Sequence, residues 1–327
     1  MTKTIFVTGG AGYIGAHCCK LFSDKGWNVV VYDNLSTGWK DFVKWGELIE
    51  SDILDSEALR QAIARIKPDI IAHFAALSEV GRSVKDPALY YRTNIVGALN
   101  VLDAMRINDV HQLVQSSTCA TYGNPQYVPI DETHPQRPAN PYGWTKLVIE
   151  QLLADHNHAH GLRYVSLRYF NAAGADPEGL IGERHRPETH VIPLALRAAL
   201  DDEYTFTVYG DDYDTYDGTA VRDYVHVLDL ADAHCRAIKY LAEGGTSNEF
   251  NLGTETGTSV AEIIDTVEAV IRRPVKRVFG GRRCGDPAAL VSSSEKAAKI
   301  LHWAPVNSNI ANIVKDAYNW HQAEIYK

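Results

Sequence analysis

TIFVTGGAGYIG (Thr4–Gly15) is the stretch that decides the fold of this 327-residue chain. An apolar, β-branched run leads directly into a glycine-rich turn, and an apolar helical pattern follows it. Glycine permits the tight turn, lets the main chain approach a pyrophosphate and lets the helix pack closely on the strand. The helix N-terminus then offers N–H groups to phosphate oxygens. We therefore predict that Gly9, Gly12 and Gly15 bind a dinucleotide.

An acidic residue in the expected place strengthens this interpretation. Asp33 ends the next strand, 18 residues after Gly15. A carboxylate there accepts hydrogen bonds from the adenosine ribose and repels a 2′-phosphate, which favours NAD over NADP as the cofactor. A glycine-rich turn without a ligand is the alternative, and the combination of strand, glycines and acid argues against it.

Short β-branched runs alternate with longer helical patterns over the first half of the chain. The predicted strands are Thr4–Thr8, Val29–Asp33, Asp69–Phe74, Gln112–Ser117 and Arg163–Arg168. Strands separated by helical segments indicate right-handed crossovers and a parallel sheet. We therefore predict an α/β fold, a Rossmann-type doubly wound parallel sheet with a smaller C-terminal substrate-binding lobe.

The composition of the sequence changes after Asn171. Gly and Pro become frequent there, and the predicted helices and strands become shorter. We expect residues 1–173 to form an NAD-binding Rossmann domain and residues 174–327 a smaller mixed α/β substrate-binding domain. The helical pattern at about 220–243 is expected to return to the first domain.

The amino-acid composition of the chain argues against several classes of protein function. Lys and Arg total 32 against 41 Asp and Glu, so the net charge is −9, which argues against nucleic acid as a partner. We expect no membrane partner, because no apolar run is long enough to span a bilayer. Five cysteines without a CxxC pair suggest neither a disulfide framework nor a zinc knuckle and favour a cytoplasmic protein. The histidines His156, His158 and His160 have no carboxylate or cysteine at matching spacing, so no metal site is predicted.

A tyrosine and a lysine at helical spacing are the predicted catalytic pair. Tyr142 and Lys146 are four residues apart in PYGWTK, so they share one face of the predicted helix. A free phenol is a poor base at neutral pH, and a nearby ammonium together with a positive nicotinamide ring would lower its pKa. The hydroxyl run Ser116–Thr118 ends the preceding strand, where a parallel sheet places its active site.

These motifs resemble the extended short-chain dehydrogenase/reductase family. Five further blocks make the resemblance more specific, to the UDP-glucose 4-epimerase group of that family, and extend it over nearly the whole chain: YDNLSTG (Tyr32–Gly38), HFAALSEVGRSV (His73–Val84), RYFNAAGA (Arg168–Ala175), GTAVRDYVHVLDLADAH (Gly218–His234) and NLGTETGTSV (Asn251–Val260). The resemblance implies an isomerase with bound NAD that oxidises a UDP-hexose at carbon 4, rotates the 4-keto sugar and reduces it again. It also implies a homodimer.

The resemblance assigns roles to individual residues. Tyr142 would be the acid/base, Lys146 would lower its pKa and hold the nicotinamide ribose, and Thr118 would hydrogen-bond the reacting hydroxyl. Positions matching cofactor contacts are Tyr13, Ile14, Asp33, Asn34, Asp52, Ile53, Phe74 and Phe170. Positions matching contacts to the uridine diphosphate are Asn171, Arg222, Arg283 and Asp286. Arginine suits the diphosphate because its guanidinium binds phosphate in a fork.

Departures from the family pattern leave the substrate range open. His190 replaces an Asn found in other members next to the sugar diphosphate, and Leu290 stands where some members carry a bulky Tyr. An epimerase acting on UDP-N-acetylhexosamine or UDP-glucuronate therefore remains an alternative. A 4,6-dehydratase or decarboxylase is disfavoured, because Cys119 and Ala120 cannot supply the extra acid/base that those enzymes use. A non-catalytic NAD(P)-sensing module would not need the intact Tyr–Lys pair.

Overall fold

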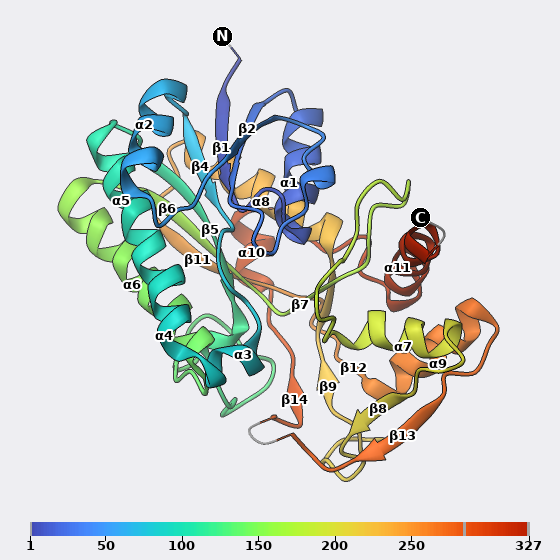
Figure 1. The fold of residues 1–327 in the computed structure, drawn as a ribbon. Helices are drawn as coiled ribbons and strands as arrows, with labels where there is room; N and C mark the ends of the chain where they lie inside the picture. The colour runs from blue at the N-terminus through green and yellow to red at the C-terminus, as the bar shows by residue number, and fades with distance from the viewer. Residues whose placement is uncertain (1, 284–285, 326–327) are drawn as a thin grey trace.

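Seven parallel strands form the central sheet of the computed structural model, which describes residues 2–283 and 286–325 (Figure 1). Their order across the sheet is β3-β2-β1-β4-β5-β6-β11, so the direction of winding reverses between β1 and β4. This arrangement confirms the predicted doubly wound α/β fold. In chain order the strands are β1 (Thr4–Thr8), β2 (Asn28–Asp33), β3 (Glu47–Glu50), β4 (Ile70–His73), β5 (Gln112–Thr118), β6 (Arg163–Tyr169) and β11 (Asn248–Leu252).

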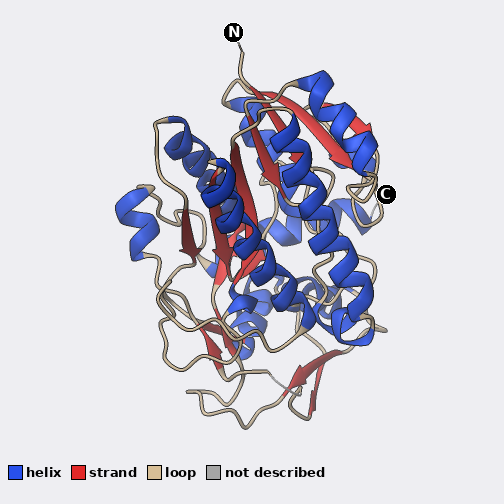
Figure 2. Cartoon of the chain, turned by 90° about the vertical axis from the view of Figure 1, so that its left-hand side faces the viewer, coloured by secondary structure: helices blue, strands red, loops and turns tan. Residues whose placement is uncertain are grey.

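Helices cover both faces of this sheet, which explains why its strands are nearly continuous apolar runs (Figures 1 and 2). In β1, Ile5 and Val7 point into the core on one face, and Phe6 points into the core on the other. The helices of this lobe are α1 (Tyr13–Asp24), α2 (Ser56–Ile66), α3 (Val80–Lys85), α4 (Pro87–Tyr90), α5 (Gly97–Ile107), α6 (Pro141–His160), α8 (Val227–Ala242) and α10 (Glu295–Ile300). Across the described ranges, no helix has the length and apolar character that crossing a membrane would require.

Short helical turns complete the first lobe. They are the 3-10 turns η1 (Lys40–Phe42) and η3 (Cys119–Thr121) and the π-helical turn η2 (Tyr91–Val96), which leads directly into α5.

A second, smaller lobe is built from short strand pairs and three helices. Helices α7, α9 and α11 share one apolar core, which includes Leu196, Ile263 and Val314. The strands pair as β7 with β10, β8 with β13, and β9 with β12 and β14. The elements are β7 (Asn171–Ala173), α7 (Val191–Leu200), β8 (Phe206–Tyr209), β9 (Val221–Arg222), β10 (Tyr224–His226), β12 (Thr258–Ser259), α9 (Val260–Ile271), β13 (Arg277–Gly280), β14 (Ala289–Leu290) and α11 (Ile310–Ile325).

The chain passes between the two lobes several times. Helix α8 packs on α1, β11 pairs with β6, and α10 contributes Ala297 to the core beneath the sheet. The sequence assigned Asn248–Leu252 and Glu295–Ile300 to the second domain, whereas these segments lie in the first. They were missed because the strand NEFNL is largely polar and the helix is only six residues long. We propose a division in which residues 1–170 form the first lobe together with α8, β11 and α10.

Helix α6 is fixed to the sheet by local capping and by a buried ion pair. The Asn140 side chain caps its N-terminus by accepting from the Gly143 N–H at 2.9 Å, and Gly161 ends it in the left-handed region. Glu150 in α6 accepts two hydrogen bonds from the Arg168 guanidinium of β6, at 2.9 and 2.6 Å. Both side chains are only 6% exposed, so each charge depends on the other for compensation.

We predict that Glu150→Ala lowers the free energy of unfolding by about 3–5 kcal/mol, because it leaves the Arg168 charge buried without its carboxylate. Denaturant titration of the purified protein measures this change. Gln151→Ala is the matched control, since Gln151 is the next residue of α6 and is exposed; it should leave the free energy nearly unchanged. Equal effects of the two substitutions would contradict the assigned role of the ion pair.

Candidate active site

The glycine turn between β1 and α1 is shaped by close main-chain contacts. Gly9 has φ of +75°, and a Cβ added there would lie 2.5 Å from the Ala75 backbone nitrogen. A Cβ at Gly15 would lie 2.3 Å from the Gly9 carbonyl oxygen. The α1 N-cap, Gly12, has no side chain to cap the first-turn N–H groups. The turn therefore leaves main-chain donors at the start of α1 that suit an anionic ligand.

Two acidic side chains lie beside this turn, at the carboxyl ends of β2 and β3. Asp33 accepts from the Ala11 N–H at 3.0 Å and from the Leu35 N–H at 2.8 Å. Burial raises the pKa of Asp33, and these two N–H groups counteract the rise. Asn34 donates to Asp52 at 2.8 Å, so this predicted pair is brought together.

The loop after β4 lies at the same carboxyl end of the central sheet. Phe74 is half-buried against the His234 ring, with the ring centroids 4.7 Å apart, and its N–H donates to the Thr8 carbonyl. Ile53 is buried, and Gly97 of α5 leaves room for its side chain, since a Cβ at that glycine would lie 2.3 Å from Ile53 Cδ1. Ile14 is half-buried against the core on the α1 face of the sheet.

Tyr13 is the first residue of α1, directly after the turn, and its hydroxyl is engaged by another part of the chain. Its hydroxyl donates to the Gly174 carbonyl at 2.6 Å, which links the start of α1 to the segment after β7. Through this bond the predicted cofactor residue contacts the part of the chain that leads into the second lobe.

The predicted catalytic residues meet at the carboxyl end of β5. Tyr142 and Lys146 lie on the same face of α6, and Thr118 is the last residue of β5. Lys146 is buried, and its Nζ donates to the Ser116 carbonyl at 2.8 Å. Burial raises the pKa of Tyr142, and a hydrogen bond with the Thr118 hydroxyl acts in the opposite direction. The three residues therefore form one group at the edge of the sheet.

Burial dominates the pKa shifts of Tyr142 and Lys146 in the chain itself. We expected Lys146 and the nicotinamide ring to lower the pKa of Tyr142, whereas burial in the chain alone raises it. Burial also lowers the pKa of Lys146 to about 8, against the raising effect of the Glu150 carboxylate.

A buried histidine beside this group was not identified from the sequence. His73, the last residue of β4, shares a 2.6 Å hydrogen bond with the Thr8 hydroxyl. Burial, followed by the nearby charge of Lys146, lowers the pKa of His73 to about 3. The imidazole is therefore neutral and packs the inner wall of the site without adding a charge. Its place inside the strand DIIAHF gave no sign of this role.

The residues predicted to hold a diphosphate lie where the second lobe begins. Arg222 in β9 pairs with Asp286 at 3.3 Å. Asn171 donates to the Asp223 carbonyl at 3.0 Å from both its N–H and its side-chain amide. Arg283 instead stacks on the Tyr209 ring, 4.1 Å from the ring centroid. The structure thus places Arg222 and Asp286 in contact and leaves Arg283 at the edge of the group.

Asp223 is the main residue that sequence reasoning missed at this end of the site. Its buried carboxylate accepts from the Thr254 N–H and hydroxyl at 2.8 and 2.6 Å, and from the Ser292 N–H and hydroxyl at 3.1 and 2.8 Å. It therefore ties β9 to two loops far away in the sequence and holds its neighbour Arg222 in place. Its only sequence signal is its position next to Arg222 in VRDYV.

Leu290 and Phe170 pack together near the catalytic group. Phe170 belongs to a small apolar cluster with Tyr122 and Ile130, and Leu290 and Cys119 pack against that cluster. Arg222 is close enough to Cys119 for its charge to oppose the rise that burial causes in the thiol pKa. The side chain at position 290 therefore borders the space between Thr118 and the diphosphate-binding residues.

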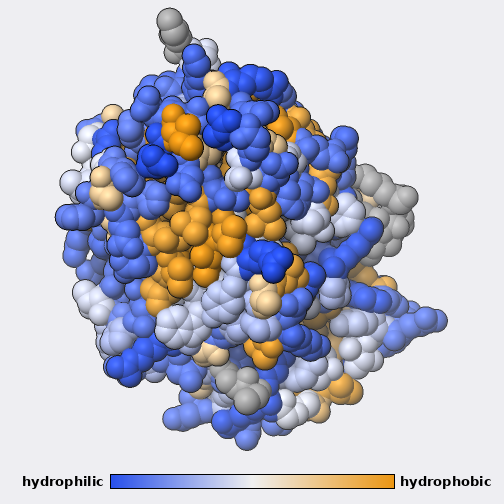
Figure 3. Space-filling model, turned by 60° about the vertical axis from the view of Figure 1, so that its left-hand side comes forward, coloured by the Kyte–Doolittle hydropathy of each residue, from blue (hydrophilic) through white to orange (hydrophobic). Residues whose placement is uncertain are grey.

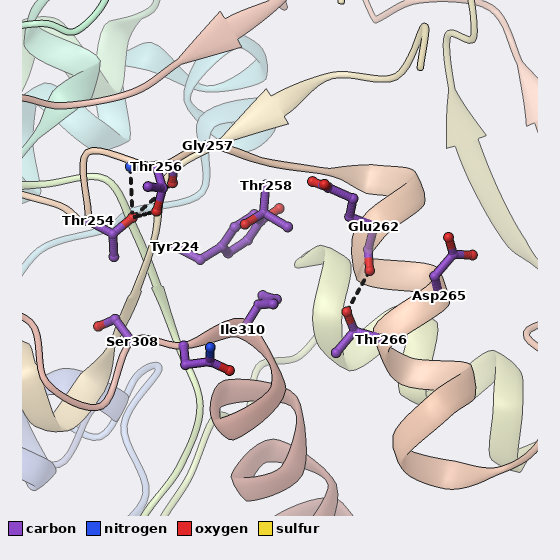
Figure 4. Close-up of a pocket in the computed structure, with 11 residues that line it drawn as sticks. Tyr224, Thr254, Thr256, Gly257, Thr258, Glu262, Asp265, Thr266, Ser308 and Ile310 are labelled. Carbon is purple, nitrogen blue, oxygen red and sulfur yellow. Dashed lines mark hydrogen bonds between the residues drawn. The ribbon is translucent and has the colours of Figure 1, made fainter. Parts of the chain in front are cut away.

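A separate pocket of about 450 Å³ lies within the second lobe (Figure 4). Side chains of Tyr224, Glu262 and Ile310 are among those that line it, and none of the predicted site residues does. Several of its polar groups are already paired; Thr266, for example, donates to the Glu262 carbonyl at 2.7 Å. We therefore place the chemistry at the edge of the central sheet.

The arrangement combines a glycine turn with main-chain donors, a carboxylate beside that turn and a phenol with a hydroxyl partner. All of them lie at the carboxyl ends of the central strands, next to the reversal in strand order between β1 and β4. Ligands of doubly wound sheets bind at this position. The site is therefore suited to proton transfer at a hydroxyl-bearing carbon beside a dinucleotide.

Comparisons with known proteins agree with this geometry. The model of the NAD dependent epimerase/dehydratase family matches residues 5–253. The UDP-glucose 4-epimerase of Rhizobium meliloti is 55% identical, over 98% of this chain and 97% of its own. The crystal structure of UDP-glucose 4-epimerase from Brucella ovis in complex with NAD is 48% identical, with a TM-score of 0.95 over 97% and 98% of the two chains. The structure from Bifidobacterium longum with NAD⁺ and UDP is 35% identical, with a TM-score of 0.93 over 99% of each chain.

We predict that Asp33→Ser weakens NAD binding by roughly 10–100-fold, because it removes a charged acceptor for the ribose hydroxyls. It should also raise the relative affinity for NADP, since the charge that repels a 2′-phosphate is lost. Titration of the NAD-depleted protein with each dinucleotide measures both effects. Asp55→Ser is the control, since Asp55 caps the nearby helix α2. Unchanged NAD affinity in Asp33→Ser would contradict the assignment.

Proposed function

This chain belongs to the NAD-dependent epimerase/dehydratase family, and we propose that it interconverts UDP-glucose and UDP-galactose by acting at carbon 4 of the hexose. The observation that carries this proposal is the group formed by Tyr142, Thr118 and Lys146 at the carboxyl end of β5. It places an acid/base and a hydroxyl partner on the same sheet edge as the dinucleotide turn. The curated relatives named UDP-glucose 4-epimerase match this chain over nearly its whole length.

The residues present fit NAD. Gly9 and Gly15 leave the space that a Cβ would fill, and the first turn of α1 directs N–H groups to the pyrophosphate position. Asp33 is held by two N–H groups and would bind the adenosine ribose. We assign further contacts to Tyr13, Ile14, Asn34, Asp52, Ile53, Phe74, Lys146 and Phe170. When bound, NAD supplies reversible two-electron redox chemistry and the positive charge of its nicotinamide ring.

Tyr142 is assigned the proton transfer. In the oxidising direction its phenolate takes the proton of the sugar 4-hydroxyl, and in the reducing direction the phenol returns a proton to the same oxygen. Each turnover therefore restores Tyr142 to its starting state. Thr118 is assigned a hydrogen bond to the reacting oxygen and to the phenol. Because burial raises the pKa of Tyr142, the phenolate requires neighbouring positive charge, and Lys146 supplies the chain's own share.

The diphosphate is assigned to the second-lobe group. Arg222 and Arg283 would bind its oxygens in fork geometry, and Asn171 and Asp286 would fix the uridine side. Epimerisation requires the sugar to present both of its faces to one acid/base, so the grip must be on the uridine diphosphate and not on the hexose. The half-buried Leu290 beside Phe170 leaves an apolar border against which the sugar can turn.

The rival substrates are not favoured. The first curated relatives, at 42–55% identity, carry the name UDP-glucose 4-epimerase, and so do most of the similar solved structures. Two solved structures described as acting on N-acetylated sugars, a UDP-Glc/GlcNAc 4-epimerase and a UDP-N-acetylglucosamine 4-epimerase, are 36% and 25% identical to this chain, below the first curated relatives. The intact Tyr–Lys pair also argues against a non-catalytic NAD(P)-sensing module.

We further propose that the protein is a homodimer. Figure 3 shows hydrophobic side chains gathered on the face that α5 and α6 present. Val96 precedes α5, Ile107 ends α5 and Trp144 lies in α6, and they are 43%, 51% and 45% exposed; contiguous exposed apolar side chains mark interaction surfaces. Two copies that pair through these helices would cover the patch in a helix bundle. We also propose a cytoplasmic location, where UDP-sugars and NAD are available and thiols stay reduced.

We predict that the purified protein converts UDP-galactose to UDP-glucose, and that Tyr142→Phe reduces this turnover at least about 100-fold. The variant should retain bound NAD, because the lost hydroxyl serves proton transfer. A coupled assay for UDP-glucose and the absorbance of the bound cofactor measure the two quantities. Near-normal turnover in the variant would remove Tyr142 as the acid/base. Faster turnover of UDP-N-acetylgalactosamine or UDP-glucuronate by the unmodified protein would favour a rival substrate.

We predict that Val96→Glu shifts the protein from dimer to monomer at micromolar concentration, because it places a charge in the proposed apolar contact. Sedimentation velocity measures the shift. Val306→Glu is the matched control, since Val306 is 79% exposed on the loop between α10 and α11, away from this face. Val306→Glu should leave the dimer intact, and a dimer that survives Val96→Glu would place the interface elsewhere.

A further inference from the structure

Four metal-ligating side chains converge in the segment between β7 and α7. They are Glu183, His185, Glu188 and His190, and one ligand atom from each lies within 4.8 Å of all the others. The segment follows the strand that starts the second lobe and ends at the N-cap of α7. The proposed epimerisation assigns no step to this cluster.

The distances within the cluster suit a single small cation. His190 Nδ1 lies 2.9 Å from an oxygen of Glu183 and 2.9 Å from an oxygen of Glu188. His185 Nδ1 lies 3.4 Å from oxygens of the same two carboxylates. A tetrahedral zinc site with bonds of about 2.0–2.1 Å has edges of roughly 3.3–3.4 Å between ligand atoms. The two His185 distances match that spacing, the two His190 distances are about 0.4 Å shorter, and either oxygen of Glu188 is within reach of one of the imidazoles.

One ligand atom is left without a hydrogen bond. His185 Nδ1 is buried and has no hydrogen-bond partner, although it faces two carboxylates. A buried polar atom of this kind is costly unless something binds it. A cation between the four groups would satisfy this atom and would also neutralise the buried Glu183 carboxylate, which is 5% exposed.

The main chain around the cluster is held from both lobes. The Trp320 indole of α11 donates to the Glu183 carbonyl at 3.1 Å, and the Trp39 indole donates to the Arg184 carbonyl at 3.0 Å. The Glu188 carboxylate accepts from the N–H groups of Thr189 and His190 at 2.7 and 2.8 Å. The ligands are therefore oriented before binding, as metal sites require.

We propose that Glu183, His185, Glu188 and His190 bind a divalent transition metal of the zinc class. Two imidazole nitrogens and two carboxylate oxygens suit Zn²⁺ and its neighbours, whereas Mg²⁺ and Ca²⁺ prefer oxygen ligands alone. Four protein ligands leave no open position, which is typical of a structural metal. The ion would fix the segment that joins the Tyr13 region of the first lobe to α7. This proposal replaces the expectation of no metal site. No sequence pattern indicated this cluster, because its four residues lie two to seven positions apart in a loop and show no periodic pattern.

The test is metal binding by the full chain, freed of any histidine tag and treated with a chelator. Equilibrium dialysis against Zn²⁺ followed by elemental analysis should give one bound ion per chain. Co²⁺ in its place should give the strong visible absorption of four-coordinate cobalt. His185→Gln should weaken Zn²⁺ binding by at least roughly 10–100-fold while the circular dichroism of the fold is retained. No substrate is present, so the result is independent of the epimerase assay.

His156→Gln is the matched control, because His156 pairs with His160 on the exposed end of α6, with ring centroids 5.4 Å apart. It should leave Zn²⁺ binding unchanged. Absence of stoichiometric Zn²⁺ would overturn the proposal and would leave the cluster as protonated imidazoles paired with carboxylates. The proposal would also be overturned if Zn²⁺ binding survived His185→Gln and were lost in His156→Gln.

Discussion

The position of helix α6 against strand β5 is the constraint on which the rest of the site depends. Lys146 reaches the Ser116 carbonyl, and one turn further along the helix Glu150 is bound by Arg168 of β6. These contacts join the helix to two neighbouring strands through buried polar groups, and such contacts tolerate little displacement. The phenol of Tyr142 is thereby held at the end of β5, beside Thr118. A helix placed by apolar packing alone would have more freedom to slide or rotate.

A second constraint is electrostatic. The site places two titratable groups, Tyr142 and Lys146, in surroundings that disfavour the charged form of each. A charge added near Tyr142 or Lys146 would therefore change the protonation state of that group. An acid/base that must both accept and donate a proton in one cycle needs such a balance, and a solvent-exposed tyrosine would not have it.

Local patterns in the sequence were enough to predict most strands of the sheet and the glycine turn between β1 and α1. The strand Thr4–Thr8, the glycine turn and the pairing of Tyr142 with Lys146 depend on neighbours a few residues away. The edge strand Glu47–Glu50 escaped notice because it has only four residues and two of them are charged. Strand β11 escaped notice because its sequence is polar and its place is set by pairing with β6.

The remainder of the site depends on contacts between distant segments. Asp223 binds Thr254 and Ser292, which lie 31 and 69 residues away, and no local pattern foretells such contacts. The burial that raises the pKa of Tyr142 likewise comes from surrounding elements and has no local pattern in the sequence. The four ligands of Glu183–His190 belong to an irregular loop whose shape depends on tryptophans 39 and 320.

The repeated passage of the chain between its lobes has a consequence for how this protein can vary. Because α8, β11 and α10 lie in sequence between elements of the second lobe and yet pack in the first, neither lobe is encoded by one uninterrupted stretch. Recombination cannot exchange the second lobe as a cassette without also removing a strand from the central sheet. New specificities must therefore arise by point changes and loop insertions within an interlaced whole.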